Sequence, residues 1–335
     1  MVAKKKEVTE VYTEIAEATT TEHEDLFSKQ NVVGVAAGNK ITDDVDTGEP
    51  CITVFVTYRV DADKLSGEDL ISPELKGYKT DVIETGEIFA GPAKDHKESV
   101  AMSEELGIET LRQRVRPVMG GYSVGHYRIT AGTIATCVYD LKPFPGIPEK
   151  YYILSNNHVL ANCNDARIGD PILQPGPYDG GTVPGDIVAR LSRYVPIKFI
   201  VPNKPVPLNY VDAAIAEGEF HNLNREIYWI GYVKQVKSKL RVGDYVEKTG
   251  RTTNFSTGKI IALHATLNVN YGYGRVARFR EQIVTTNMSA PGDSGSLVCD
   301  IKEGAVGLLF AGSSQVTISN SIVQVQNRLR IRLHP

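Results

Sequence analysis

Residues 291–299 have the sequence Pro-Gly-Asp-Ser-Gly-Ser-Leu-Val-Cys, a glycine-rich turn that leads into an apolar strand. A serine hydroxyl is a poor nucleophile at neutral pH, so it needs a base and a group that stabilises negative charge. Small residues on both sides of Ser294 let a carbonyl carbon approach it, and they let the N–H groups of Gly292 and Ser294 converge on an oxyanion. Taken alone, the same string fits a hairpin turn with a solvated serine equally well.

A candidate base follows the predicted strand 151–155, where the sequence continues as Asn-Asn-His-Val-Leu. A histidine at the end of a buried strand is held rigidly, as a general base must be. The alternative for His158 is a structural role, in which the ring bonds to a backbone carbonyl.

A candidate carboxylate interrupts the apolar strand 210–216, Tyr-Val-Asp-Ala-Ala-Ile-Ala. Burial of Asp212 without a partner is costly. The pattern therefore favours an imidazole that the carboxylate orients, and the alternative is an aspartate exposed at a strand end.

These three segments, in the order His158, Asp212, Ser294, together resemble the chymotrypsin and trypsin-like serine peptidase family over about residues 118–333. The resemblance implies two antiparallel six-stranded β-barrels, with the histidine and aspartate from the first and the serine from the second. It implies that His158 takes the proton of Ser294, that Asp212 fixes the tautomer, and that the N–H groups of Gly292 and Ser294 form the oxyanion hole. The expected activity is cleavage of polypeptides by a serine endopeptidase through an acyl-enzyme, without a cofactor.

The resemblance also indicates which residues contact the substrate. The residue six positions before the nucleophile, at the base of the specificity pocket in the digestive enzymes, is Met288, and Phe310-Ala311-Gly312 aligns with their Ser-Trp-Gly. Without a buried carboxylate there is no electrostatic preference for Lys or Arg, so an uncharged residue is expected before the cut bond. Substrates are expected to add as a strand against residues near Ala311 to Ser313. The alternative is that Met288 and Phe310 are core residues.

The segment Arg116-Pro117-Val118-Met119-Gly120-Gly121 resembles the Ile-Val-Gly-Gly start of the mature animal enzymes. In those enzymes a newly cut amino terminus pairs with the aspartate before the nucleophile, which is Asp293 here. Cutting before Pro117 is chemically awkward, and bacterial relatives commonly need no such activation. We therefore expect a constitutively folded site.

The chain as a whole predicts a mainly β protein with a small α/β domain in front. We expect a polar arm or loosely attached helix over 1–30, the small α/β domain over 31–92, a helical linker over 93–117 and the protease domain over 118–335. The small domain resembles, more loosely, the amino-terminal module of bacterial trypsin-like peptidases related to the plant narrow-leaf protease.

Local patterns predict the elements of these parts. Strands are expected at 32–35, 52–56 and 80–89, a long hairpin loop at 43–50, and helices at 61–70, at 102–114 and around Ile322, Val325 and Leu329.

Composition excludes several classes of partner. The net charge is −3, and no Lys/Arg run follows Lys4-Lys5-Lys6, so nucleic acid is not expected. No apolar run approaches the length of a membrane span, and no signal peptide is recognised. The cysteines lack the spacing of a zinc site and are expected to be reduced thiols of a cytoplasmic protein, with one bridge, Cys137 to Cys163, left open.

Two other functions remain open at this point. One is a protease-fold binding or scaffold protein that is held inactive, and the other is a self-processing protein that cuts once before the barrels. Homo-oligomer formation through the N-terminal domain is also left open.

Overall fold

The computed structural model describes residues 8–20, 22–91, 111–129, 131–141 and 150–334. Six antiparallel strands of the C-terminal part close into a barrel, because β17 pairs with both β16 and β18 while the remaining strands follow in the order β18-β21-β20-β19-β16. The strands are β16 (Tyr245–Gly250), β17 (Asn254–Asn270), β18 (Val276–Thr286), β19 (Leu297–Asp300), β20 (Gly304–Gly312) and β21 (Val316–Ser321).

A second antiparallel sheet is formed by the middle of the chain, with the order β22-β8-β9-β13-β11-β10-β6-β7. The strands are β6 (Ser123–His126), β7 (Gly132–Thr133), β8 (Thr136–Asp140), β9 (Tyr151–Ser155), β10 (Pro171–Leu173), β11 (Ile187–Tyr194), β13 (Ala214–Gly218) and β22 (Ile331–Arg332). The sheet has eight strands where six were expected, because two short strands, β7 and β22, extend its ends. The expectation of a mainly β chain built on antiparallel sheets, one of them closed into a six-stranded barrel, is confirmed.

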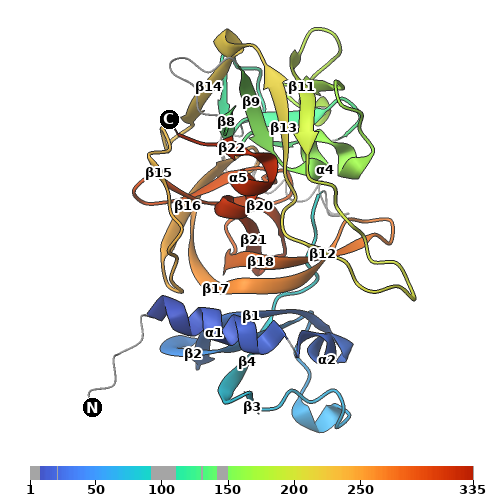
Figure 1. Cartoon of the computed structure of the whole chain (residues 1–335), viewed down its shortest axis with the longest axis vertical. Coiled ribbons are helices and arrows are strands. Elements are labelled where there is room, and N and C mark those ends of the chain that lie inside the picture. Colours follow the sequence, from blue (N-terminus) through green and yellow to red (C-terminus); the bar gives the residue numbers. More distant parts are fainter. Residues whose placement is uncertain (1–7, 21, 92–110, 130, 142–149, 335) are drawn as a thin grey trace.

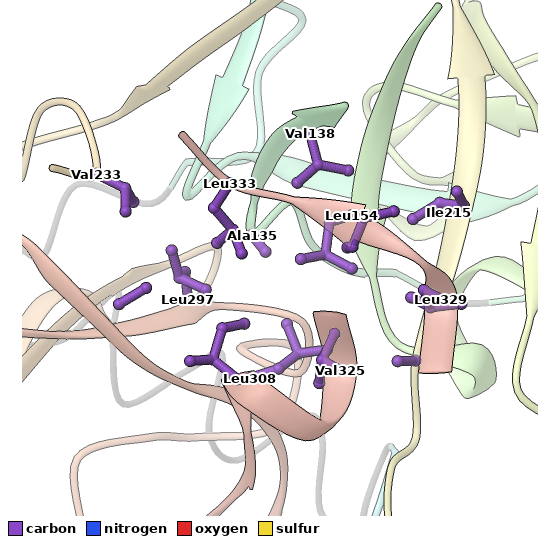
Figure 2. Packing of buried hydrophobic residues seen from close by; sticks show 14 of the residues in the cluster. Ala135, Val138, Leu154, Ile215, Val233, Leu297, Leu308, Val325, Leu329 and Leu333 are labelled. Atoms are coloured by element: carbon purple, nitrogen blue, oxygen red, sulfur yellow. The ribbon is translucent and has the colours of Figure 1, made fainter. Parts of the chain in front are cut away.

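The two sheets share an apolar core that positions everything between them. Leu154 of β9, Leu308 of β20 and Val325 of the predicted C-terminal helix, α5 (Ile322–Leu329), belong to one buried cluster (Figure 2). The segment between β12 (Leu208–Asn209), which pairs with β18, and β13 crosses from one sheet to the other. Residues on this crossing therefore lie at the interface of the two sheets.

The N-terminal elements continue the barrel sheet instead of standing apart from it. Strand β1 (Val32–Thr42) pairs antiparallel with β17 on one side and with β2 (Val45–Val56) on the other, and β4 (Tyr78–Glu84) and β3 (Glu74–Leu75) complete the row. Figure 1 shows these elements, in blue, along β17. The boundaries at residues 30, 92 and 117 stay predictions.

Helices α1 (Val8–Thr20) and α2 (His23–Ser28) lie where an arm or a loosely attached helix was expected, and they are packed against the sheet and not loose. Ile15 is fully buried, and the Tyr12 hydroxyl donates to Asn39 Oδ1 at 2.6 Å, because the apolar side of α1 covers the face of β1.

Three further local predictions differ from the structure. The predicted loop at 43–50 is a tight turn at Asp43 and Asp44, whose φ values of 50° and 61° suit a two-residue hairpin, so β2 already begins at Val45. The predicted helix at 61–70 is one 3-10 turn, η1 (Ala62–Lys64). The strand expected to reach Phe89 ends at Glu84, and a left-handed glycine follows at position 86.

The helix expected at 102–114 falls largely outside the described residues, and 111–117 are not helical. The remaining short elements are α4 (Asn157–Leu160), η2 (Asn162–Asn164), η3 (Pro177–Asp179), η4 (Phe220–Asn222), β5 (Val118–Gly120), β14 (Leu223–Ile227) and β15 (Gln235–Val236). Within the described ranges, no helix is long and apolar enough to cross a bilayer.

Candidate active site

His158 lies in α4, directly after β9, the strand that pairs with β8 and β13. Its ring atom Nδ1 lies 2.6 Å from Asp212 Oδ2, and its backbone N–H donates to Asp212 Oδ1 at 3.1 Å. An ionised carboxylate only accepts hydrogen bonds, so this contact places the ring proton on Nδ1 and leaves Nε2 as an acceptor. The Nε2 atom is buried and has no hydrogen-bond partner among the described residues.

Asp212 lies on the crossing before β13, so it is not within a strand as predicted, and its side chain is fully buried. The Tyr271 hydroxyl donates to Oδ2 at 2.8 Å. The backbone of Asp212 is held as well: its N–H donates to Asn320 Oδ1 at 2.9 Å, and its carbonyl accepts from Asn156 Nδ2 at 2.8 Å. These contacts compensate the cost of burying a carboxylate.

Tyr271 connects this carboxylate to an aromatic group at the end of β17. Its ring lies edge-on to the His158 ring, with 6.1 Å between the ring centroids, and it also contacts the rings of Phe199 and Phe279. Burial, followed by the charge of Asp212 and the hydrogen bond to it, raises the pKa of the Tyr271 phenol well above its usual value. The hydroxyl therefore remains a donor.

Ser294 lies in the turn between β18 and β19, against the other sheet. Its carbonyl accepts from Thr133 N at 2.8 Å, and a Cβ added to Gly132 would meet both this carbonyl and Val159, the neighbour of His158. Gly295 has a φ of 100°, and a Cβ there would lie 2.1 Å from Ser155 Oγ, so the turn needs glycine to pack this closely.

The same turn carries two backbone donors. Gly292 has a φ of 101°, and neither its N–H nor that of Ser294 has a hydrogen-bond acceptor among the described residues. Free N–H groups of this kind suit a developing oxyanion.

Asp293, between these two residues, is fully buried and forms an ion pair with the equally buried Lys248 of β16, at 3.1 Å. The Lys248 ammonium also donates to Thr253 Oγ1. Burial raises the pKa of the Asp293 carboxyl, but the Lys248 charge and several hydrogen bonds outweigh burial, and the net effect lowers this pKa below its usual value. The carboxylate is therefore ionised and fixes the turn through hydrogen bonds from Thr253 Oγ1 and from the N–H groups of Thr252, Thr253 and Ala290.

The segment that resembles a mature amino terminus lies elsewhere. Val118 is buried in β5, paired with β14, and the guanidinium of Arg116 donates to Gln174. The charge opposite Asp293 comes from Lys248 instead.

Met288 and Phe310 pack in two different apolar clusters, and the Met288 N–H donates to Thr317 Oγ1, whose residue pairs with Gly312. Met288 is buried in a cluster with Val246 and Ile260, whereas Phe310 is fully buried in another cluster, with its ring 4.8 Å from Phe279. Ala311 and Gly312 lie at the end of β20. The local strings around His158, Asp212 and Ser294 did not point to four residues that hold them: Asn156, Lys248, Tyr271 and Asn320.

The cysteines and the potential metal ligands are the side chains from which a disulfide or a metal site would form. All four cysteines are free thiols, so the bridge left open between Cys137 and Cys163 is not formed. The described part of the chain contains no group of three or more His, Cys, Asp or Glu side chains that would hold a metal ion.

Comparison with known proteins completes the picture. A family model described as a trypsin-like peptidase domain matches residues 135–308, more than half of the chain. Protease A of Thermobifida fusca is 13% identical, with 65% of this chain and 98% of its own covered, and a TM-score of 0.44. The Nocardiopsis protease is 18% identical, with 65% and 99% covered and a TM-score of 0.44, and a Cellulomonas bogoriensis chymotrypsin is 16% identical, with 64% and 97% covered and a TM-score of 0.42. No curated protein matches the chain.

Proposed function

Because the chain belongs to the trypsin-like peptidase family, we propose that it is a serine endopeptidase whose triad is His158, Asp212 and Ser294. The observation that carries this proposal is the contact between His158 Nδ1 and Asp212 Oδ2, which leaves Nε2 buried and without a hydrogen-bond partner among the described residues. Gly132, whose added Cβ would meet both Val159 and the Ser294 carbonyl, connects the histidine segment to the Ser294 turn. A ring in this tautomer is an acceptor for a serine proton.

The proposed reaction follows from these positions. Ser294 Oγ attacks the carbonyl carbon of the peptide bond while its proton passes to His158 Nε2, and the negative oxygen is bound by the N–H groups of Gly292 and Ser294. The imidazolium then gives its proton to the leaving amine, which departs as the acyl-enzyme forms. A water molecule then attacks the ester carbonyl while the same ring takes its proton, and the imidazolium returns this proton to Ser294 Oγ as the acid product leaves.

Replacement of the nucleophile tests the proposal. We expect Ser294→Ala to lower kcat on a peptide substrate on the order of a millionfold. The Ser294 hydroxyl has no hydrogen bond to the described residues, so the thermal unfolding midpoint of the variant should match that of the parent. The parent should also react with a fluorophosphonate at Ser294. Equal peptide cleavage by parent and variant would refute the assignment.

We propose further that the enzyme prefers an uncharged residue before the cut bond and needs no cleavage at Arg116. The first point is supported by apolar residues where a carboxylate would select Lys or Arg: Met288 and Phe310 are both buried among hydrophobic side chains. The second is supported by Lys248, which already pairs with Asp293. A peptide library tests the first, and intact mass measured together with activity tests the second.

Location and assembly are separate proposals. The four free thiols, of which Cys51, Cys137 and Cys299 are buried, suit a reducing compartment and support a cytoplasmic location, which cell fractionation would check. Oligomer formation through the N-terminal part stays a prediction for sedimentation analysis.

A further inference from the structure

The edge of β20 where a substrate strand is expected is already occupied by the chain itself. Phe89 N–H donates to the carbonyl of Gly312 at 3.0 Å, and Gly312 N–H donates to the carbonyl of Phe89 at 3.0 Å. The two residues form an isolated antiparallel bridge, so both backbone groups of Gly312 on this edge are taken.

The other side of the same segment is held by the end of β17. Ala90 N–H donates to the carbonyl of Asn270 at 2.9 Å, and Asn270 N–H donates to the carbonyl of Ile88 at 2.9 Å. The Asn270 side chain donates to Glu87 at 2.6 Å. Residues 88–90 are therefore hydrogen-bonded on one side to Gly312 of β20 and on the other to Asn270, the residue that precedes Tyr271.

This segment is also anchored by its side chains. Ile88 is 1% exposed and Ala90 is 7% exposed, and both belong to the apolar cluster that contains Phe55 and Phe310. Such burial, together with four backbone hydrogen bonds, holds the segment in place.

The direction of the pairing gives the position of Phe89 relative to the nucleophile. Leu309 of β20 exchanges hydrogen bonds with Gly295 and Ser296, the two residues after Ser294. From Leu309 the strand continues away from Ser294 to its end at Gly312. A strand antiparallel to β20 therefore runs toward Ser294, as the acyl side of a substrate must. If the residue whose carbonyl is attacked, the first before the cut bond, lies opposite Phe310, then the pairing can be counted along both strands. Two residues further along β20 is Gly312, and two residues back along the substrate is the third residue before the cut bond, so these two lie opposite each other.

We infer that residues 88–90 occupy the place of the acyl-side substrate strand, so that Phe89 takes the position of the third residue before the cut bond. This inference rests on the proposed function. It makes the N-terminal segment a determinant of specificity: substrates gain no backbone pairing beyond their second acyl-side residue. Recognition then depends on the two residues before the bond and on the leaving side.

The test compares Phe89→Pro, which lacks the N–H that bonds Gly312, with Phe89→Ala, which keeps it. Two fluorogenic peptides share the same two residues before the cut bond, and one of them carries two further residues on the acyl side. The ratio of their kcat/KM values measures the gain from lengthening the peptide. For the parent and for Phe89→Ala, we expect this gain to stay within about twofold. For Phe89→Pro we expect about tenfold or more, because the proline ring replaces the N–H that faces the Gly312 carbonyl and pushes the segment off β20, which makes both backbone groups of Gly312 available to the substrate.

Fluorophosphonate labelling of Ser294 separates the possible failures. If all variants are labelled, and lengthening the peptide raises kcat/KM equally for the parent and for Phe89→Pro, the inference is wrong. The proposed endopeptidase function would then still stand. No labelling of the folded parent would overturn both. Where Phe89→Pro does not fold, Ile88→Ala, which removes the buried anchor, replaces it: a larger gain than in the parent supports the inference, and an unchanged gain contradicts it.

Discussion

Tyr271 has a distinct part in the proposed triad. Its hydroxyl and the His158 ring share one carboxylate oxygen, Asp212 Oδ2, at 2.8 and 2.6 Å. Tyr271, which directly follows β17, supplies a hydroxyl to this carboxylate, and we assign it a positioning role.

Tyr271→Phe should therefore lower kcat by about tenfold at nearly unchanged KM, because the ring stays packed while Asp212 loses one donor and His158 is held less firmly. Steady-state kinetics on a short peptide measure both constants. The matched control is Tyr273→Phe on the same turn, whose side chain is 99% exposed and which should behave as the parent does. A rise in KM at constant kcat would contradict a role through Asp212.

At this scale, what the sequence predicts depends on how far apart the interacting residues lie. Ser294 and His158 are each marked by a short local string, and Asp212 by being the acid in an apolar segment. The partners that hold them come from far along the chain: Tyr271 is 59 residues from Asp212, and Lys248 is 45 from Asp293. Neither Tyr271 nor Lys248 has a local pattern that indicates such a contact.

Among the elements, β1 carries the connection between the N-terminal part and the barrel. It pairs with β2 and, through Gly34 and Val35, with Leu267 and Thr266 of β17. A Cβ on Gly34 would lie 2.2 Å from Leu267 Cδ2 and 3.2 Å from the Thr266 carbonyl oxygen, so a side chain there has to displace the buried Leu267 side chain.

Gly34→Val should lower the free energy of unfolding by about 1–3 kcal/mol through overpacking. Because β1 and the barrel share one sheet, far-UV circular dichroism and peptidase activity should be lost in a single transition at lower urea concentration. Thr42→Val, at the exposed end of the same strand, serves as the control and should leave the midpoint in place. Loss of activity at the parent's midpoint, with an earlier partial loss of dichroism, would instead indicate an N-terminal part that unfolds by itself.

The elements predicted best are those with a clear period of their own. The spacing of Ile322, Val325 and Leu329 predicts α5, because all three are buried on one side. The joining of β1 to β17 was not predicted, because strand pairing across more than 200 residues depends on backbone groups that every residue carries. The pairing of Phe89 with Gly312 could not be predicted for the same reason.

For the molecule as a whole, the buried ion pair of Lys248 and Asp293 couples the conformation of the turn around Ser294 to the stability of the fold. Both side chains are fully buried, and removal of one partner of such a pair leaves an uncompensated charge. Lys248→Met should therefore destabilise the fold by about 3–5 kcal/mol near neutral pH, and it should reduce activity because the N–H groups that flank Asp293 lose their fixed positions.

The pH dependence of this loss has a defined sign. In the parent, the pKa of Asp293 is lowered, so its stabilising contribution is present above the usual aspartate range and is lost as the pH falls through the folded-state value. Without the Lys248 ammonium the pKa rises relative to the parent, so the variant takes up the proton at higher pH. The stability difference between parent and Lys248→Met should therefore be larger at pH 7 than at pH 4, as urea unfolding at the two values would measure. The double variant Lys248→Met with Asp293→Asn has no charge to bury. Its stability difference from the parent should therefore decrease only at the low pH where Asp293 of the parent itself becomes protonated. If the single variant had the same deficit at both pH values, Lys248 would not be the group that keeps Asp293 ionised.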